Sequence, residues 1–251
     1  MAEGVTNSSA NQHSNVQVNK RLWLIRHGLT DWNMHQRFCG RSDIPLSEQG
    51  QAQALWIAKQ LLQENISVIY TSDLVRACET AEIIASQRAT AVQIKKSSDW
   101  REMDFGEWEG LTYAQIAEQF KDQLGFFIDP EHHSPPNGES LAHVQQRVMD
   151  AFLAIVRSDV MLLTGDAVII SHAGPLRILL CNLLGIAFQR QWQIKLDPGS
   201  LSAIDLLPGY GSSEPYAVLS LLNVQIPIPI NHPTQGQFSS SELEIMGRFK
   251  E

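Results

Sequence analysis

Two kinds of hydrophobic pattern alternate along the chain. Short apolar runs stop abruptly at polar or turn-forming residues, at 22–25, 66–70 and 167–170, and only the second contains a polar residue, Ser67. Such runs are typical of strands buried on both faces, as in parallel sheets. Between them, apolar residues recur at helical spacing, which predicts helices over 47–65, 74–84, 140–152 and 175–184. Shorter strands are expected at 92–94, 200–206 and 216–222, the last two joined by a turn at 208–211.

Residues that favour helix starts stand in front of these helices. Ser47 is the expected N-cap of the first helix. The triplet Thr71-Ser72-Asp73 ends one strand and is expected to cap the helix that follows, which places Arg76 in its first turn. Pro175 suits the first position of the last helix.

Two of the apolar runs end in a histidine followed closely by glycine. The first continues as Arg26-His27-Gly28 and the third as Ser171-His172-Ala173-Gly174. In open α/β sheets, ligands bind at the carboxyl ends of the strands. Two such strands lying near each other would bring His27 and His172 together over one pocket.

The residue types at these strand ends suit a phosphoryl group. Arg26 offers a planar fork of donors that fits phosphate oxygens, and Gly28 allows the backbone to approach an anion closely. Asn33 can donate an amide hydrogen bond to the same anion, and Arg76 adds charge at a helix N-terminus that already favours anions. A neutral His27 is a competent nucleophile, so this combination points to a phosphohistidine intermediate. The alternative is a buried strand with a purely structural histidine.

The longer motifs resemble those of the histidine phosphatase superfamily, the phosphoglycerate mutase-like proteins. Arg26-His27-Gly28 with Thr30, Trp32 and Asn33 is similar to the opening signature of that family. The loop at 37–50, the Ser72-Asp73-Leu74-x-Arg76-Ala77 segment and the late Ser-His-x-Gly extend the resemblance over about 21–223. It implies a three-layer α/β/α sandwich with a mostly parallel central sheet and a small lid insertion.

Five acidic residues are interleaved with aromatic side chains between 99 and 109. Burial against aromatic rings favours the neutral form of a carboxyl, which can donate a proton. The stretch is similar to the family motif Arg-Glu-x-x-x-Gly-x-x-Glu-Gly, whose first Glu is the proton donor, and that position is Glu102. Glu107 and Glu109 are interpreted as structural or solvent-facing.

The resemblance also implies how these residues divide the reaction. His27 attacks phosphorus while Glu102 protonates the leaving alkoxide, and water activated by Glu102 then cleaves the phosphohistidine. Arg26, Arg76, Asn33 and His172 hold the phosphoryl oxygens, and the arginines keep His27 unprotonated. Cys39, Gly40 and Ala173 are expected to line the substrate pocket beside Asn33. No metal or other cofactor is expected.

Three departures from the mutases favour a phosphatase. Gly174 stands where mutases carry Asn, Cys39 stands where they carry Thr, and the insertion after the acid motif is short and lacks an Arg pair. The expected substrate is a small phosphorylated metabolite, because the short insertion is similar to α-ribazole and broad-specificity phosphatases. Phosphoglycerate mutase-type transfer is the alternative, and a non-catalytic phosphoryl-binding protein is a third.

The segment at 112–140 is expected to form a lid that begins as a helix and continues as a Pro-rich loop. Phe126 and Phe127 would give it an apolar underside over the strand ends. Asp129, His132 and His133 could also be read as a metal cluster, but adjacent histidines in a Pro-rich loop rarely share one ion.

Composition limits the partners more than the fold. The formal net charge of −8 disfavours a broad nucleic-acid or lipid-binding surface, and no apolar run approaches the length of a membrane helix. Three cysteines without C-x-x-C spacing favour a reduced, cytoplasmic protein. Residues 1–20 are expected to be a disordered tail, 21–225 the phosphatase-like domain, and 226–251 a C-terminal extension. The oligomeric state stays open, a homodimer included.

Overall fold

The computed structural model describes residues 20–160, 165–207 and 216–226. Within these residues one six-stranded sheet has the order β3-β2-β4-β1-β5-β6. Its strands are β1 (Lys20–Arg26), β2 (Ile66–Ser72), β3 (Gln93–Ser97), β4 (Asp166–Ser171), β5 (Leu201–Leu207) and β6 (Tyr216–Val224). The block β3-β2-β4-β1 is parallel, whereas β5 pairs antiparallel with both β1 and β6. β6 therefore runs in the same direction as β1, and the expected mostly parallel sheet is confirmed in its main block.

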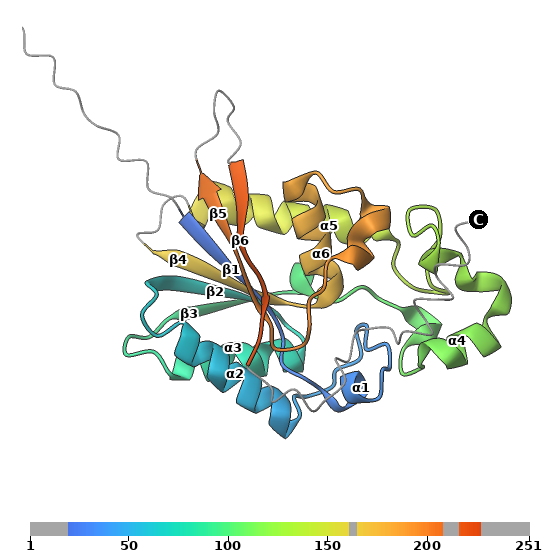
Figure 1. The fold of residues 1–251 in the computed structure, drawn as a ribbon, viewed down its shortest axis with the longest axis horizontal. Helices are drawn as coiled ribbons and strands as arrows, with labels where there is room; N and C mark the ends of the chain where they lie inside the picture. Colours follow the sequence, from blue (N-terminus) through green and yellow to red (C-terminus); the bar gives the residue numbers. More distant parts are fainter. Residues whose placement is uncertain (1–19, 161–164, 208–215, 227–251) are drawn as a thin grey trace, which may run out of the picture.

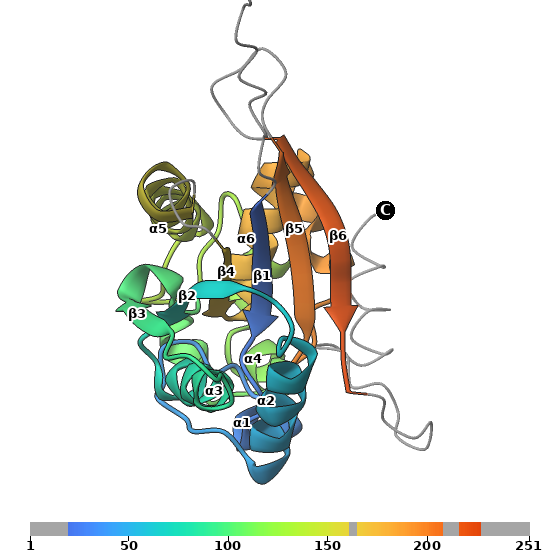
Figure 2. The same ribbon diagram turned by 90° about the vertical axis from the view of Figure 1, so that its left-hand side faces the viewer.

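Helices cover both faces of this sheet (Figure 1), so the three-layer arrangement is confirmed. α2 (Glu48–Gln60) and α3 (Val75–Ser86) lie on one face, and α5 (Leu141–Ala154) and α6 (Ala173–Leu184) on the other (Figure 2). The short helices α1 (Asp31–Met34) and α4 (Tyr113–Gln119) lie beyond the carboxyl ends of the parallel strands. A π-helical turn at Ile155–Val160 continues α5, and 3-10 turns occupy Ser98–Trp100, Gly106–Trp108, Lys121–Phe127 and Phe188–Gln193.

The central strand β1 shows why its unbroken apolar run is needed. Leu22 and Leu24 pack into the core under α5 and α6, whereas Trp23 and Ile25 pack into the core under α2 and α3. Side chains alternate across a strand, so a strand between two helical layers must be apolar at every position. Burying each of these side chains contributes roughly 1.5–3 kcal/mol. That burial fixes where β1 ends, and hence where His27 lies.

The structure confirms the expected start of α2 and corrects that of α3. Ser47 caps α2 as predicted, because its hydroxyl accepts the Gly50 N–H. The N-cap of α3 is Leu74, which makes no side-chain cap, so the capping role predicted for Thr71-Ser72-Asp73 is wrong. Instead Asp43 Oδ1 accepts the Val75 N–H at 2.7 Å. A carboxylate from another loop therefore stabilises this helix start.

α6 begins two residues earlier than expected. His172 is its N-cap, so Pro175 occupies the third helical position instead of the first. The first four N–H groups of a helix have no partner within it, so a proline in the third position removes no hydrogen bond. The early start places the N–H of Gly174 in the first turn, where it faces the acidic segment.

The segment at 112–140 adds aromatic side chains to the core. Phe126 and Phe127 are 1% and 7% exposed, and the Phe127 ring stacks on Trp108 with ring centroids 5.0 Å apart. Its role as a lid stays a prediction. The expected turn at 208–211 and the extensions at 1–19 and 227–251 lie outside the described residues, and Lys20 belongs to β1. None of the helices in the described residues is both long and apolar enough for a bilayer crossing.

Candidate active site

β1 and β4 bring the two motif histidines side by side. The strands are parallel neighbours with Arg26 opposite Ser171, and the His27 N–H donates to the Ser171 carbonyl at 3.0 Å. The His27 and His172 ring centroids lie 4.9 Å apart, and both residues are almost fully buried. The sheet register itself therefore brings the two imidazoles together.

Hydrogen bonds assign opposite tautomers to these rings. His27 Nδ1 lies 2.7 Å from the Gly28 carbonyl, which can only accept, so Nδ1 carries the proton and Nε2 keeps its lone pair. His172 Nδ1 accepts from Arg76 Nε at 3.3 Å, so its proton sits on Nε2. Nε2 of His172 has no hydrogen-bond partner among the described residues. One ring thus presents a lone pair and the other a buried donor.

Burial and positive neighbours keep both rings neutral. Desolvation lowers the pKa of His27 well below its usual value, and the charges of Arg76 and Arg26 lower it further. The pKa of His172 is lowered well below its usual value by the same burial and by Arg76. At neutral pH the nucleophilic form of His27 is therefore the populated one.

The two arginines are positioned by backbone carbonyls. Arg26 Nη1 donates to the Leu196 carbonyl at 2.6 Å, whereas its buried Nε has no partner among the described residues. Arg76, on α3, donates from Nη1 to Ser42 at 2.8 Å and from Nη2 to Gly40 at 2.7 Å. These bonds hold the Arg76 guanidinium beside His172 and leave N–H groups for an anion, because three of its five donors are used.

Glu109 fixes the loop that holds Arg76. Its carboxylate accepts the N–H groups of Arg41 and Ser42 at 2.7 and 2.9 Å, and the Ser42 hydroxyl as well. Gly40 has φ +48°, and a Cβ there would lie 1.9 Å from Glu109 Oε1. Of the two roles expected for Glu109, the structure shows the structural one. Only the Glu-Gly pair of its motif hinted at this contact.

Glu102 reaches the same region from an irregular segment. It is 8% exposed, and its two oxygens accept the N–H groups of Met103 at 2.9 Å and Gly174 at 3.3 Å. Gly174 lies two residues beyond His172, so the carboxylate sits at the N-terminus of α6 beside the histidine pair. A Cβ at position 174 would lie 2.3 Å from Glu102 Oε1. Glycine at this position is therefore what allows the carboxylate to approach the helix.

The geometry matches a known family over most of the chain. The model of the histidine phosphatase superfamily (branch 1) matches residues 22–216. The chain belongs to this superfamily.

Several relatives of this histidine phosphatase are themselves named as phosphatases. Phosphoserine phosphatase 1 of Hydrogenobacter thermophilus is 34% identical over 187 residues, which cover 74% of this chain and 86% of the relative. The adenosylcobalamin/alpha-ribazole phosphatase of Escherichia coli is 31% identical over 204 residues, covering 81% and 95%. The crystal structure of the alpha-ribazole phosphatase from Shigella flexneri superposes with a TM-score of 0.69 at 29% identity, covering 81% and 96%. The chain is accordingly a phosphatase that hydrolyses phosphomonoesters.

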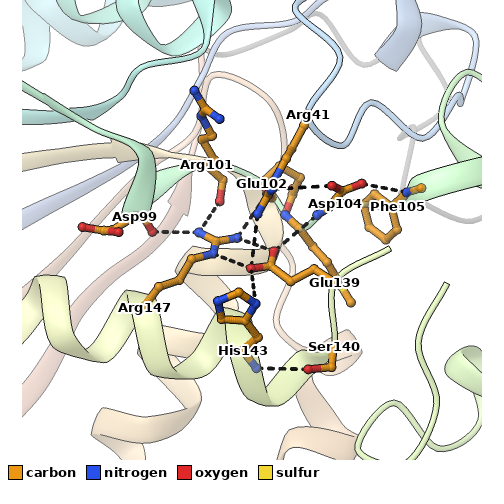
Figure 3. A network of polar contacts seen from close by, with 12 residues as sticks. Arg41, Asp99, Arg101, Glu102, Asp104, Phe105, Glu139, Ser140, His143 and Arg147 are labelled. Atoms are coloured by element: carbon orange, nitrogen blue, oxygen red, sulfur yellow. Dashed lines mark hydrogen bonds and ion pairs between the residues drawn. The ribbon is translucent and has the colours of Figure 1, made fainter. Parts of the chain in front are cut away.

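A clamp from α5 supports the acid segment of this histidine phosphatase (Figure 3). Arg147 donates to the backbone carbonyls of Asp99 and Arg101 at 2.7 Å and of Glu102 at 3.1 Å. Its guanidinium also forms a pair of 2.9 Å bonds with Glu139. One arginine, with a side chain only 10% exposed, thus holds three backbone carbonyls at Glu102 and just before it.

Glu139 connects Arg147 to the loop at 40–42, the same loop that holds Arg76. Its side chain is 3% exposed, and Arg41 Nη2 approaches it to 3.3 Å (Figure 3). Arg41 belongs to the loop that Glu109 holds. Sequence reasoning assigned no role to Glu139 or Arg147, because an acid and a base eight positions apart on a loop and a helix give no local signal of their contact.

Of the remaining predicted site residues, Asn33 and Cys39 lie around α1 and Ala173 lies in α6. Asn33 Oδ1 accepts from Thr30 N and Oγ1 and completes a capping box, while its Nδ2 points to Cys39 Sγ at 3.6 Å. Cys39 is buried, which raises the pKa of its thiol. Ala173 follows His172 in the first turn of α6. The structure brings His27, His172, Arg76 and Glu102 together, whereas the side chain of Asn33 is engaged in capping.

The acidic and histidine residues at 129–133 do not converge on an ion site. His132 Nδ1 pairs with the Asp129 carboxylate at 2.9 Å, and His133 Nδ1 faces the Asp129 carbonyl at 3.1 Å. Within the described ranges, no three His, Cys, Asp or Glu side chains are placed to hold a metal.

Proposed function

We propose that this phosphatase acts on a small phosphorylated metabolite, with His27 as nucleophile and Glu102 as proton donor. In the first step His27 Nε2 attacks phosphorus. The bond from phosphorus to the leaving oxygen breaks, and that oxygen takes the proton of the Glu102 carboxyl. In the second step the Glu102 carboxylate takes a proton from water, the resulting hydroxide attacks phosphorus, and the bond to Nε2 breaks. Both side chains return to their starting protonation states.

The observation that carries this proposal is the pair of opposite tautomers. The lone pair on His27 Nε2 is the group that must attack, and the proton on His172 Nε2 is the group that stabilises oxygen charge. Arg26 and Arg76 add positive charge where the phosphoryl oxygens would lie. General acid–base help from Glu102 is worth about 10²–10⁴-fold in rate.

The pocket around these groups is completed by four residues. Asn33 donates from Nδ2 towards the phosphoryl group after a small rotation of its amide, and Cys39, Gly40 and Ala173 form walls of the pocket. Small side chains there leave the anion close to backbone N–H groups. Replacing Asn33 with Asp keeps the capping oxygen and removes the amide donor, so it separates capping from phosphate binding.

Removal of the nucleophile is the direct test. His27→Ala should lose at least about 10³-fold in turnover of p-nitrophenyl phosphate, while substitution of His35, an exposed histidine at the C-cap of α1, by Ala should keep the normal rate. Acid-labile phosphoprotein should accumulate in rapid-quench samples of the unaltered enzyme and be absent from the His27 variant. A normal rate in His27→Ala would refute the covalent route. Activity in excess EDTA tests the expectation that no metal takes part.

The cellular setting is also a proposal. The three cysteines are buried and unpaired, which supports a reducing compartment such as the cytoplasm. A homodimer stays a prediction, to be measured by light scattering.

A further inference from the structure

An ion pair connects the residue beside Glu102 to the turn that leads into α3. Arg101 Nε and Nη2 each donate to one carboxylate oxygen of Asp73 at 2.6 Å. This two-bond fork is the strong form of an arginine–carboxylate contact. Arg101 directly precedes Glu102, and Asp73 lies three residues before Arg76 in the turn between β2 and α3. The pair therefore joins the segment of the expected proton donor to the turn that presents one of the expected phosphate ligands.

The pair and Arg147 hold this segment from different directions. Arg147, on α5, binds the backbone carbonyls of Arg101 and Glu102. The Arg101 side chain points away from Arg147 (Figure 3) and reaches Asp73 next to α3, whereas α5 lies on the other face of the sheet (Figure 2). Each contact therefore restrains Glu102 in a direction that the other does not.

Arg76 is the better anchored end of this connection. It lies in α3, and its side chain makes three hydrogen bonds, to Ser42, Gly40 and His172. Glu102 lies between two 3-10 turns, in a segment without strand or helix of its own. Breaking the ion pair should therefore move Glu102 and leave Arg76 in place.

The exposure of the pair argues against a mainly structural role. The hydrogen bonds from Arg101 lower the pKa of Asp73, so both partners are charged at neutral pH. Their side chains are 36% and 29% exposed, and ion pairs in contact with water contribute little to stability. A displacement of about 1 Å, by contrast, can cost about 10²-fold in rate. Geometry is thus the quantity that this pair can influence most.

We propose that Asp73 and Arg101 are positioning residues that set the span between Arg76 and Glu102. That span has to match one phosphoryl group together with its leaving oxygen, because Arg76 holds the phosphoryl oxygens while Glu102 protonates the oxygen that departs. The inference rests on the proposed function, since it needs Glu102 as proton donor. Both residues of the pair act through Glu102 and take no part in bond making or breaking.

A second pair of the same kind provides a matched control. Arg21 Nε and Nη2 donate to the two carboxylate oxygens of Asp205 at 2.7 and 3.0 Å, and the side chains are 35% and 24% exposed. Arg21 lies near the start of β1, six residues before His27, which is roughly 20 Å along a strand. Charge, hydrogen-bond geometry and exposure are similar to those of the Asp73–Arg101 pair, so the main difference is the distance from the site.

The test compares the rates of phosphoenzyme formation on two substrates by rapid quench. β-Glycerol phosphate needs protonation of its leaving oxygen, whereas p-nitrophenyl phosphate needs little. Asp73→Asn should lower the first rate about tenfold and the second less than about threefold, while the inhibition constant of inorganic phosphate stays unchanged. Arg101→Lys keeps the charge without the fork, so its rates should lie between those of Asp73→Asn and of the unaltered enzyme. Asp205→Asn should leave both rates unchanged, although it removes a similarly exposed ion pair.

A double variant shows whether the pair acts through Glu102. Once Glu102→Gln has removed the proton, Asp73→Asn has nothing left to position. It should then change the rate on β-glycerol phosphate less than about twofold. A further tenfold loss in that background overturns the inference, and so does an unchanged ratio of the two rates in Asp73→Asn alone.

The outcomes separate this inference from the proposed function. An equal loss on both substrates in Glu102→Gln refutes the proton donor, and the inference fails with it. A selective loss in Glu102→Gln without one in Asp73→Asn overturns only the positioning role. A loss in Asp73→Asn that is equal for both substrates also overturns it, because the pair would then serve phosphate binding. If Asp73→Asn does not fold, Arg101→Lys decides, since unaltered rates in that variant contradict the inference.

Discussion

His27 and Glu102 both reach the N-terminus of α6, yet the chain holds them by different means. His27 follows directly on β1, and its own N–H continues the pairing with β4. Its position is thus set by backbone hydrogen bonds and by the two cores on either side of the sheet. No single side chain outside the sheet is needed to place it.

Glu102 lies between two 3-10 turns, where no strand or helix fixes the backbone. The carbonyls around it are held by Arg147, a side chain on α5, which is itself held by Glu139 (Figure 3). Part of the site therefore depends on the sheet and part on a few buried side chains. The position of His27 should therefore tolerate substitutions of neighbouring side chains better than the position of Glu102 does.

The largest expected effect comes from replacing Glu102, because the replacement removes the proton transfer itself. Glu102→Gln keeps the shape but cannot transfer a proton, so kcat for alkyl phosphates should fall about 10²–10⁴-fold. p-Nitrophenyl phosphate needs little protonation of its leaving oxygen, so its first step should fall much less. Rapid-quench rates on both substrates measure the difference, with exposed Glu107→Gln as control. An equal loss on both substrates would contradict the role of Glu102 as proton donor.

Breaking the clamp should harm stability and acid catalysis together. Arg147→Met leaves Glu139 buried without its main partner, and removing one member of a buried pair costs roughly 3–5 kcal/mol. The free energy of unfolding in urea should fall by that amount, and kcat on alkyl phosphates should fall about tenfold through the displaced Glu102. Arg147 and Glu139 contact each other directly, so the double variant with Glu139→Gln should lose less than the sum of the two single losses. Additive losses would show that the clamp does not act as a unit.

Substitution of Glu109 tests the part of the site expected to bind the phosphoryl group. There the loop at 40–42 positions Arg76. Glu109→Gln weakens the hold on residues 40–42 and so lets Arg76 shift from His172. The inhibition constant of inorganic phosphate should rise about tenfold, because one charged hydrogen bond is worth about 1.5–3 kcal/mol. The loss should be equal for alkyl and aryl substrates, unlike that of Glu102→Gln. A loss confined to alkyl substrates would instead show that Glu109 supports protonation of the leaving oxygen by Glu102.

The smallest expected effect concerns pH. The pKa values of His27 and His172 are lowered by burial, so the unfolded state binds more protons than the folded state below the usual histidine pKa of about 6.5. Stability is therefore complete above that pH and falls as the pH drops, by at most about 1.4 kcal/mol per pH unit for each ring. Urea unfolding between pH 7 and 5 measures this slope. His172→Asn should flatten it, and an unchanged slope would show that the ring is not kept neutral.

The strand ends and the motif histidines could be predicted from the sequence. Unbroken apolar runs such as 22–25 and 167–170 mark buried strands, and chemistry-bearing residues placed just after them must emerge at one edge of a parallel sheet. Glu102 was assigned as the proton donor only through the resemblance of its segment to a family motif, and that role stays a prediction. The reversed direction of β5 could not be read, because an apolar run is the same in either direction.

Contacts between distant positions were decided by the tertiary structure alone. Three contacts join residues that share no local pattern: Asp43 caps α3, Glu109 holds the Arg76 loop, and Arg147 clamps the Glu102 backbone. Hydrophobic periodicity reports only which face of a segment is buried. Which buried polar group meets which partner depends on how the layers pack, and that packing brings Arg76 to His172 and so sets the proton position on this ring.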